Sequence, residues 1–236
     1  FFWTMLPLLS AVLGDVFRPF NPWRAVGLGS SWLRARVAPG RHHAPARFAY
    51  PEKLGLWPAL HGLFAFGWLE LVAGEDGREP KLLATLMLVY LAFQLVGMAM
   101  FGPRRWLERG DAFGVYFEFF SRIAPLTVVK RALHARVPLS GLTDITSIAG
   151  TVVFICTMSG ITVFDGLERG GIWQSIAGKD PSALVMTLGL IASVGIVVGF
   201  YRLGVLGMEG SHIEKSPREL SFLFAPSLVP IALGYL

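Results

Sequence analysis

Charged residues are scarce in this chain. They make up 16% of its 236 residues, whereas apolar residues make up 53%. An ordinary soluble domain carries about 25% charged residues. The apolar residues are gathered in long stretches, as expected for a chain surrounded by lipid. The composition therefore argues against a soluble protein and predicts an all-α bundle of transmembrane helices, formed as a single domain over residues 1–236.

Cysteine is almost absent, and the motifs that identify common reactions are absent altogether. The single cysteine, Cys156, lies in an apolar run, which excludes a disulfide framework and a thiolate metal cluster. The sequence has no His-Glu-x-x-His motif, no phosphate-binding glycine loop with lysine and no Gly-x-Ser-x-Gly elbow. It also lacks the fingerprints of flavin and nicotinamide nucleotide sites. Local motifs therefore leave the cofactor and the reaction unknown.

The net charge of +5 does not indicate a nucleic-acid partner. The basic residues lie in loops between the apolar stretches, without the aromatic residues that accompany them in nucleic-acid-binding motifs. Membrane topology explains them better, because Lys and Arg accumulate in cytoplasmic loops. The expected partner is the lipid bilayer.

Six apolar stretches approach the roughly 20 residues that a helix needs to cross a hydrocarbon core of roughly 30 Å. The chain begins with Phe1, and both ends lie inside apolar runs, so we expect it to be part of a longer chain. The predicted spans are Phe1–Phe17, Leu54–Val72, Leu82–Gly102, Ser147–Phe164, Ala183–Tyr201 and Leu220–Leu236.

The loops between these spans carry an independent signal for topology. In chain order they contain 7, 2, 7, 2 and 3 Lys and Arg residues. This alternation is expected when successive loops lie on opposite sides of the membrane. The excess of positive charge on the cytoplasmic side places loops 18–53, 103–146 and 202–219 in the cytoplasm.

The segment Ala112–Val129 is apolar enough for a seventh span, but a seventh crossing would break the charge alternation. Glu118 and Arg122 are four residues apart, so they share one helical face and can form an ion pair. Pro125 interrupts the helix beyond that pair. We therefore expect an amphipathic or re-entrant helix on the cytoplasmic side.

Small residues and prolines predict how the spans pack. Gly195 and Gly199 form one pair of small residues four positions apart, and Gly189 and Ser193 form another. Such pairs allow two helices to approach closely. Pro226 and Pro230 each remove a backbone donor from the last span and predict kinks there.

Ionisable groups in a membrane cost about 3 kcal/mol each on insertion scales, so they are natural candidates for function. Asp15 and Asp111 each lie in a Gly-Asp-x-Phe element at the predicted cytoplasmic face, and Glu118 follows close by. The three carboxylates are candidates to bind a divalent cation or to carry protons. Alternatively, Asp15 pairs with Arg18 or Arg24, and Asp111 caps the following helix. The remaining candidates at this face are Asn21, Arg24 and Arg122.

Three further candidates lie within spans or at their outer ends. Glu70 ends the second span and Asp165 ends the fourth, so each either lines an external site or is an ordinary interfacial carboxylate. His61 shares one helical face with Trp57, Phe64 and Trp68 at 100° per residue. It is either a ligand or a histidine that serves helix packing.

Four stretches of the chain carry a family resemblance, and they occur in residues 14–24 (GDVFRPFNPWR), 50–58 (YPEKLGLWP), 110–117 (GDAFGVYF) and 162–167 (TVFDGL). They resemble a family of bacterial polytopic membrane proteins whose members are often labelled fenitrothion hydrolase. The similarity extends over nearly the whole chain, with the stretches in the same order. The resemblance implies hydrolysis of an aryl phosphotriester at the bacterial cytoplasmic membrane. A divalent metal is then the expected cofactor, because such reactions usually use a metal-activated water.

Three functions remain open from the sequence. The first is a membrane-bound hydrolase with Asp15, Asp111 and Glu118 as candidate catalytic residues. The second is a transporter or channel for a small solute. The third is a non-catalytic subunit that packs against a partner membrane protein through its small-residue helix faces.

Overall fold

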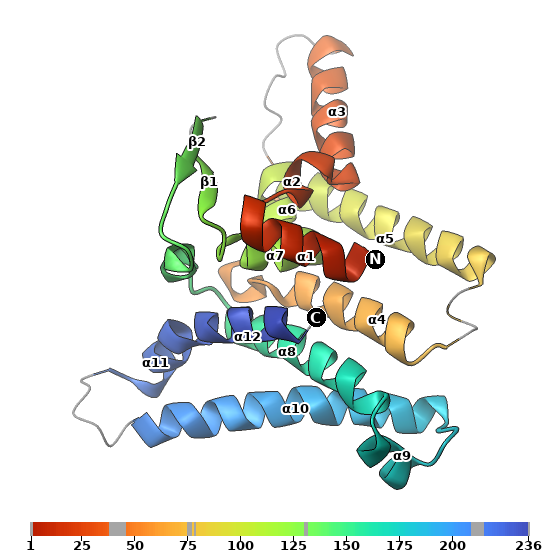
Figure 1. Cartoon of the computed structure of the whole chain (residues 1–236). Coiled ribbons are helices and arrows are strands. Elements are labelled where there is room, and N and C mark those ends of the chain that lie inside the picture. Colours follow the sequence, from red (N-terminus) through yellow and green to blue (C-terminus); the bar gives the residue numbers. More distant parts are fainter. Residues whose placement is uncertain are drawn as a thin grey trace.

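The structure is a computed structural model and describes residues 2–37, 46–74, 77, 79–129, 132–208 and 215–235. These residues are predominantly helical, which confirms the all-α fold class (Figure 1). The exception is a two-stranded antiparallel hairpin, with β1 at Leu126–Val129 and β2 at Ala132–Ala135. Residues 38–45, 130–131 and 209–214 of the predicted cytoplasmic loops lie outside the described residues.

Three of the described helices are long and apolar enough to cross a membrane. They have 22, 18 and 26 residues and coincide with the third, fourth and fifth predicted spans. Their composition is that expected of a membrane protein. They are α5 (Pro80–Phe101), α8 (Thr151–Glu168) and α10 (Ala183–Met208).

The other three predicted spans form shorter helices. Two of these have 12 and 15 residues and rise about 18 and 23 Å, less than a hydrocarbon core of roughly 30 Å. The last predicted span is broken at Pro226, where the predicted kink takes the form of a 3₁₀ turn between two helices. Six crossings therefore do not follow from helix length alone. The elements are α1 (Phe2–Leu13), α4 (Trp57–Leu71), α11 (Pro217–Phe224), η4 (Ala225–Ser227) and α12 (Leu228–Gly234).

A short buried helix, α7 (Ala112–Ser121), forms the centre of the fold. Seven of its ten residues are buried, and it packs against α1, α4 and α12. Ten residues rise about 15 Å, half of a hydrocarbon core, so α7 does not form a seventh crossing. Its burial excludes the amphipathic surface helix that was one of the two expectations. The chain leaves this helix before Pro125 and continues into the hairpin.

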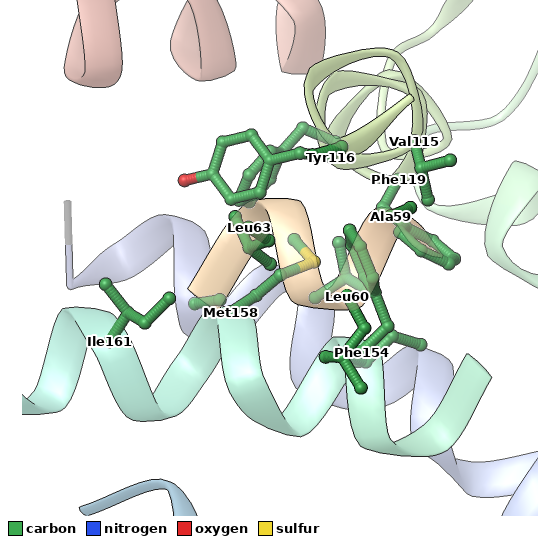
Figure 2. Packing of buried hydrophobic residues seen from close by; sticks show 14 of the residues in the cluster. Ala59, Leu60, Leu63, Val115, Tyr116, Phe119, Phe154, Met158 and Ile161 are labelled. Atoms are coloured by element: carbon green, nitrogen blue, oxygen red, sulfur yellow. The ribbon is translucent and has the colours of Figure 1, made fainter. Parts of the chain in front are cut away.

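The hydrophobic core joins α4, α7 and α8. Figure 2 shows Leu63 of α4, Tyr116 of α7 and Met158 of α8 among side chains that meet between the three helices. All three are fully buried, as is Phe154 one turn before Met158. Burying a side chain of this size contributes about 1.5–3 kcal/mol, so this contact holds α7 inside the bundle.

Glycines set the close packing between α8 and α10. A Cβ atom on Gly160 would lie 2.6 Å from the Cα atom of Val194, and one on Gly189 would lie 2.3 Å from the ring of Trp173. Ser193 is also buried, so both residues of the predicted pair lie inside the fold, where Gly189 makes room for the rings of Trp173 and Phe164 rather than for the backbone of another helix. A Cβ atom on Gly195 would meet none of the described atoms within 4 Å.

The elements that position the candidate site gather at one end of the molecule. They include α3, which projects away from the other helices (Figure 1). Most of them belong to the loops that the charge pattern places in the cytoplasm. The elements of the whole fold that have not been named above are α2 (Phe17–Phe20), α3 (Pro22–Val37), η1 (Glu52–Leu54), α6 (Pro103–Arg109), η3 (Ser140–Asp144) and α9 (Gly171–Ala177). Of these, α9 contributes no residue to the candidate site.

Candidate functional site

A cavity of about 760 Å³ lies where the α2–α3 junction faces α6 and α7. Six arginines and three carboxylates line it, so the lining carries a formal excess of three positive charges. The charged lining residues are Arg18, Arg24, Arg104, Arg105, Arg109 and Arg122 with Asp15, Glu108 and Glu118. This arginine cavity is the largest concentration of the candidate residues that the sequence indicated.

The arginines differ in how their charge is neutralised. Arg122 pairs with Glu118 at 2.6 Å, which confirms the ion pair predicted from their spacing. Glu108 contacts two exposed arginines of α6, at 3.2 and 3.8 Å. Within the described part of the chain, no carboxylate lies within 4.0 Å of the guanidinium groups of Arg18, Arg24 or Arg109. Of the three, Arg109 lies over the ring of Tyr50, 5.4 Å from its centroid, which leaves Arg18 and Arg24 as the charges that no described carboxylate or ring contact engages.

Asp15 lines the cavity from the turn between α1 and α2. Its Oδ1 atom accepts a hydrogen bond of 3.0 Å from the backbone N–H of Arg18, so the predicted partner is contacted through its main chain. Burial raises the pKa of Asp15, and the negative charge of Glu118 raises it further. The Arg18 amide and the charges of Arg18 and Arg122 act in the opposite direction. Asp15 is thus a partly desolvated carboxyl group beside arginines.

Asp111 lies behind the cavity rather than in its lining. Its side chain is fully buried, and Oδ2 accepts a hydrogen bond of 2.6 Å from Nδ2 of Asn21. Oδ1 accepts from the Tyr90 hydroxyl at 2.8 Å and from Nε2 of Gln94 at 3.2 Å. Asp111 occupies the N-cap position of α7, and the amides of Phe113 and Gly114 in the first turn lie near enough to favour its charged form. Its hydrogen bonds to other side chains run instead to the α2–α3 junction and to α5.

Burial raises the pKa of Asp111, because the charged form loses water. The hydrogen bonds from Asn21 and Tyr90 favour the charged form and limit this effect, as do the amides at Phe113 and Gly114. A buried carboxyl without a cationic partner is costly unless donors surround it. The neutral donors around Asp111 provide that compensation.

Three members of this network were not among the candidates taken from the sequence. Gln94 is fully buried in α5, and its Oε1 accepts a hydrogen bond of 2.5 Å from Nε1 of Trp106. The Tyr90 hydroxyl accepts from the backbone N–H of Ala112 at 3.1 Å while it donates to Asp111. A glutamine inside an otherwise apolar span was the signal that could have identified the network.

The structure does not bring Asp15, Asp111 and Glu118 together around one cation. Both oxygens of Asp111 accept hydrogen bonds, and only the other two carboxylates reach the cavity. Among the described residues, no three His, Cys, Asp or Glu side chains form a group that could hold a metal ion. The donors present thus do not fit the metal that the resemblance implies.

The remaining candidates lie apart from the arginine cavity. His61 lines a separate, open pocket of about 510 Å³ with Trp57 and Phe64, which confirms their common face. Its Nδ1 atom lies 2.7 Å from the carbonyl oxygen of Trp57. Glu70 and Asp165 lie near each other at the opposite end of α4 and α8, and Asp165 pairs with Arg169 at 2.5 Å.

Comparison of the chain with protein-family models, with curated proteins and with solved structures gave no match. The hydrolase activity implied by the four similar stretches therefore stays a prediction. The class that fold and site define is a helical membrane protein with an arginine-lined cavity at one end.

Proposed function

We propose that this chain is a multi-pass protein of the bacterial cytoplasmic membrane and that it hydrolyses phosphorus esters in the arginine cavity. One observation carries the proposal: Asp15 and Glu118 line a single cavity together with six arginines. A carboxylate beside guanidinium groups combines a base for water with donors for a developing negative charge.

The proposed topology has six crossings with the cavity on the cytoplasmic side. The three long apolar helices supply half of the crossings, and the alternation of charge between loops supports the remainder. Most of the cavity lining belongs to loops 18–53 and 103–146, both of which are rich in arginine. The cavity therefore opens to the cytoplasm, the side on which the charge pattern places these two loops.

Asp15 is the proposed general base. Its pKa is raised by burial, and a carboxylate of raised pKa accepts a proton from water more readily. Glu118 is the weaker candidate because it is already paired with Arg122. The water oxygen forms a bond to phosphorus, its proton passes to Asp15, and the aryl oxygen leaves with the electron pair of the broken P–O bond. Arg18 and Arg24 stabilise the negative charge that develops on the phosphoryl oxygens.

The test follows nitrophenolate release from a nitrophenyl phosphotriester and from the anionic nitrophenyl phosphate by the purified chain in mild detergent, with and without added divalent metal. Asp15→Asn is expected to lower turnover about 100-fold or more, the usual contribution of a positioned base. Asp180→Asn, which removes an exposed carboxylate distant from the cavity, is the matched control and should retain turnover. Absence of turnover of both esters in folded protein, with and without metal, would overturn the proposal. Movement of an anion into sealed vesicles without hydrolysis would assign the cavity to a transporter.

A second candidate function is that of a subunit in a larger membrane assembly. It is favoured by Gly195 and Gly199, since a Cβ atom on either would meet none of the described atoms within 4 Å. The pair is thus free for a helix of a partner membrane protein. Gly199→Leu should then abolish co-purification of a fixed partner while the chain alone retains its melting temperature. If partner and yield are unchanged, this face does not bind a subunit.

A further inference from the structure

The lining of the arginine cavity combines apolar and cationic side chains. Its apolar lining includes Phe17 of α2, Leu56 before α4, and Val115 and Phe119 of α7. All four side chains are less than a tenth exposed, so they belong to the rigid core as well as to the cavity. A ligand that fills this cavity therefore meets fixed apolar side chains as well as arginines.

The lining holds more positive charge than its own carboxylates neutralise. Arg18 and Arg24 lie on the α2–α3 junction and have no ion-pair partner among the described carboxylates, whereas Arg122 at the end of α7 has Glu118. Neighbouring guanidinium groups repel one another, and an anion bound between them relieves that repulsion. Guanidinium groups also match the geometry of phosphate oxygens. A neutral triester offers these groups no net charge to balance.

The wall formed by the α2–α3 junction, which carries Arg18 and Arg24, is attached to the wall formed by α7. Asn21 lies between Arg18 and Arg24 in the chain, and its side chain is bonded to the buried Asp111 just before α7. The α2–α3 junction is therefore attached to α7, which contributes Val115, Phe119 and Glu118 to the opposite wall. Such preorganisation lets a site bind a charged group without first reorganising its own dipoles.

We propose that the cavity takes an amphiphilic phosphate ester, with its anionic phosphate against Arg18 and Arg24 and its aryl or alkyl group against Phe17, Val115 and Phe119. This names the substrate class of the proposed hydrolase and rests on the same site. A volume of about 760 Å³ lies within the range of about 300–1,000 Å³ that small-molecule sites occupy. The shared chemistry belongs to two sources, the headgroup of an anionic phospholipid and a soluble organic phosphate.

The experiment measures binding to the full chain in mild detergent by calorimetry with four probes. Phenyl phosphate carries both charge and an apolar group, inorganic phosphate lacks the apolar group, triphenyl phosphate lacks the charge, and dihexanoyl phosphatidic acid represents a lipid. Phenyl phosphate or the lipid is expected to bind at least tenfold more tightly than inorganic phosphate and the neutral triester. Tighter binding of phenyl phosphate would identify a soluble organic phosphate as the natural ligand, and tighter binding of the phosphatidic acid would identify a phospholipid headgroup.

Two variants test the role of the arginines. Arg24→Gln and Arg18→Gln should each weaken binding of the tighter probe about tenfold or more, and added salt should weaken binding to the unaltered chain. Arg18 is exposed, so its replacement tests the site even if the Arg24 variant fails to fold. Arg218→Gln, an exposed arginine of α11 outside the cavity lining, is the matched control and should bind normally.

Equal affinity for triphenyl phosphate and phenyl phosphate, or binding unchanged in both arginine variants, would overturn the inference. Anion binding without turnover would support the inference and remove the hydrolase. Turnover of a neutral triester without binding of either anionic ester would keep the hydrolase and overturn the substrate class.

Discussion

Asn21 and Asp111, 90 positions apart in the chain, are joined by a buried hydrogen bond of 2.6 Å from Nδ2 of the amide to Oδ2 of the carboxyl. The Oδ1 atom of the same Asn21 side chain accepts hydrogen bonds from the backbone N–H groups of Trp23 and Arg24, at 2.9 and 3.1 Å. One amide thus caps the start of α3 and attaches it to the residue that precedes α7.

The donor and acceptor pattern of this pair predicts that its two side chains can be exchanged. Asp111→Asn places an amide donor against the Nδ2 donor of Asn21 and should lower the free energy of unfolding by about 1–3 kcal/mol. For a chain of this size, each kcal/mol corresponds to about 2–4 °C in melting temperature. In the double variant Asn21→Asp/Asp111→Asn, the new carboxylate still accepts from the α3 amides and also accepts from the new amide. Thermal unfolding in detergent should therefore show recovery of most of the loss.

The double variant also has a second expected effect. It moves a negative charge from behind the cavity to position 21, which lines it. Binding of phenyl phosphate should then be weaker than in the unaltered chain even though stability has recovered. A double variant no more stable than Asp111→Asn alone would show that the two side chains are not coupled.

Tyr90→Phe tests the second donor to Asp111. The change removes the hydroxyl that donates to Oδ1 at 2.8 Å and accepts from the Ala112 amide at 3.1 Å. Two buried groups lose a partner, so the melting temperature should fall by an amount that corresponds to about 1–3 kcal/mol. Phe93→Leu, a nearby change on the same helix that removes no hydrogen bond, serves as the control. A smaller loss for Tyr90→Phe than for the control would contradict the role of the hydroxyl.

Asp15 should make the stability of the protein depend on pH with a defined sign. Its pKa is raised above the ordinary value of 3.8, mainly by burial, so the folded state holds the proton more tightly than the unfolded chain. The resulting stabilisation of the folded state is fully present below pH 3.8, the ordinary pKa of the group, and is lost as the pH rises through the folded-state pKa. The melting temperature of the unaltered chain, measured relative to that of Asp15→Asn, should therefore decrease from acid to neutral pH. A difference that increases over this range would contradict the assignment.

The close contact between α8 and α10 predicts opposite effects for two glycines. Gly160→Ala would place a Cβ atom 2.6 Å from the backbone of Val194, and overpacking of this kind costs about 1–3 kcal/mol. Gly195→Ala meets none of the described atoms within 4 Å and gains helix propensity, so it should leave the melting temperature unchanged or raise it. Equal melting temperatures for the two variants would show that the helices do not approach at Gly160.

Part of the candidate site was predictable because it depends on local spacing. Glu118 and Arg122 lie one helical turn apart, and their ion pair follows from that spacing. Asp15 and Glu118 were expected at the same face because both lie beside cytoplasmic loops, and both line the cavity. The role of Asp111 was not predictable, because its side-chain partners come from α5 and from Asn21 at the α2–α3 junction, which are distant in the sequence.

The sequence by itself determined that this is an α-helical chain of membrane composition with its basic residues in alternate loops. Those properties follow from the residue content of each segment and from side-chain patterns that repeat every few residues, both of which are local to the chain. Only the tertiary structure decided that α7 is buried, that Asp111 lies behind the cavity and that the arginines of two loops line the same space. The physical reason is that burial and contact depend on which segments pack together, and residues 21 and 111, 90 positions apart in the chain, are brought into contact by the tertiary fold.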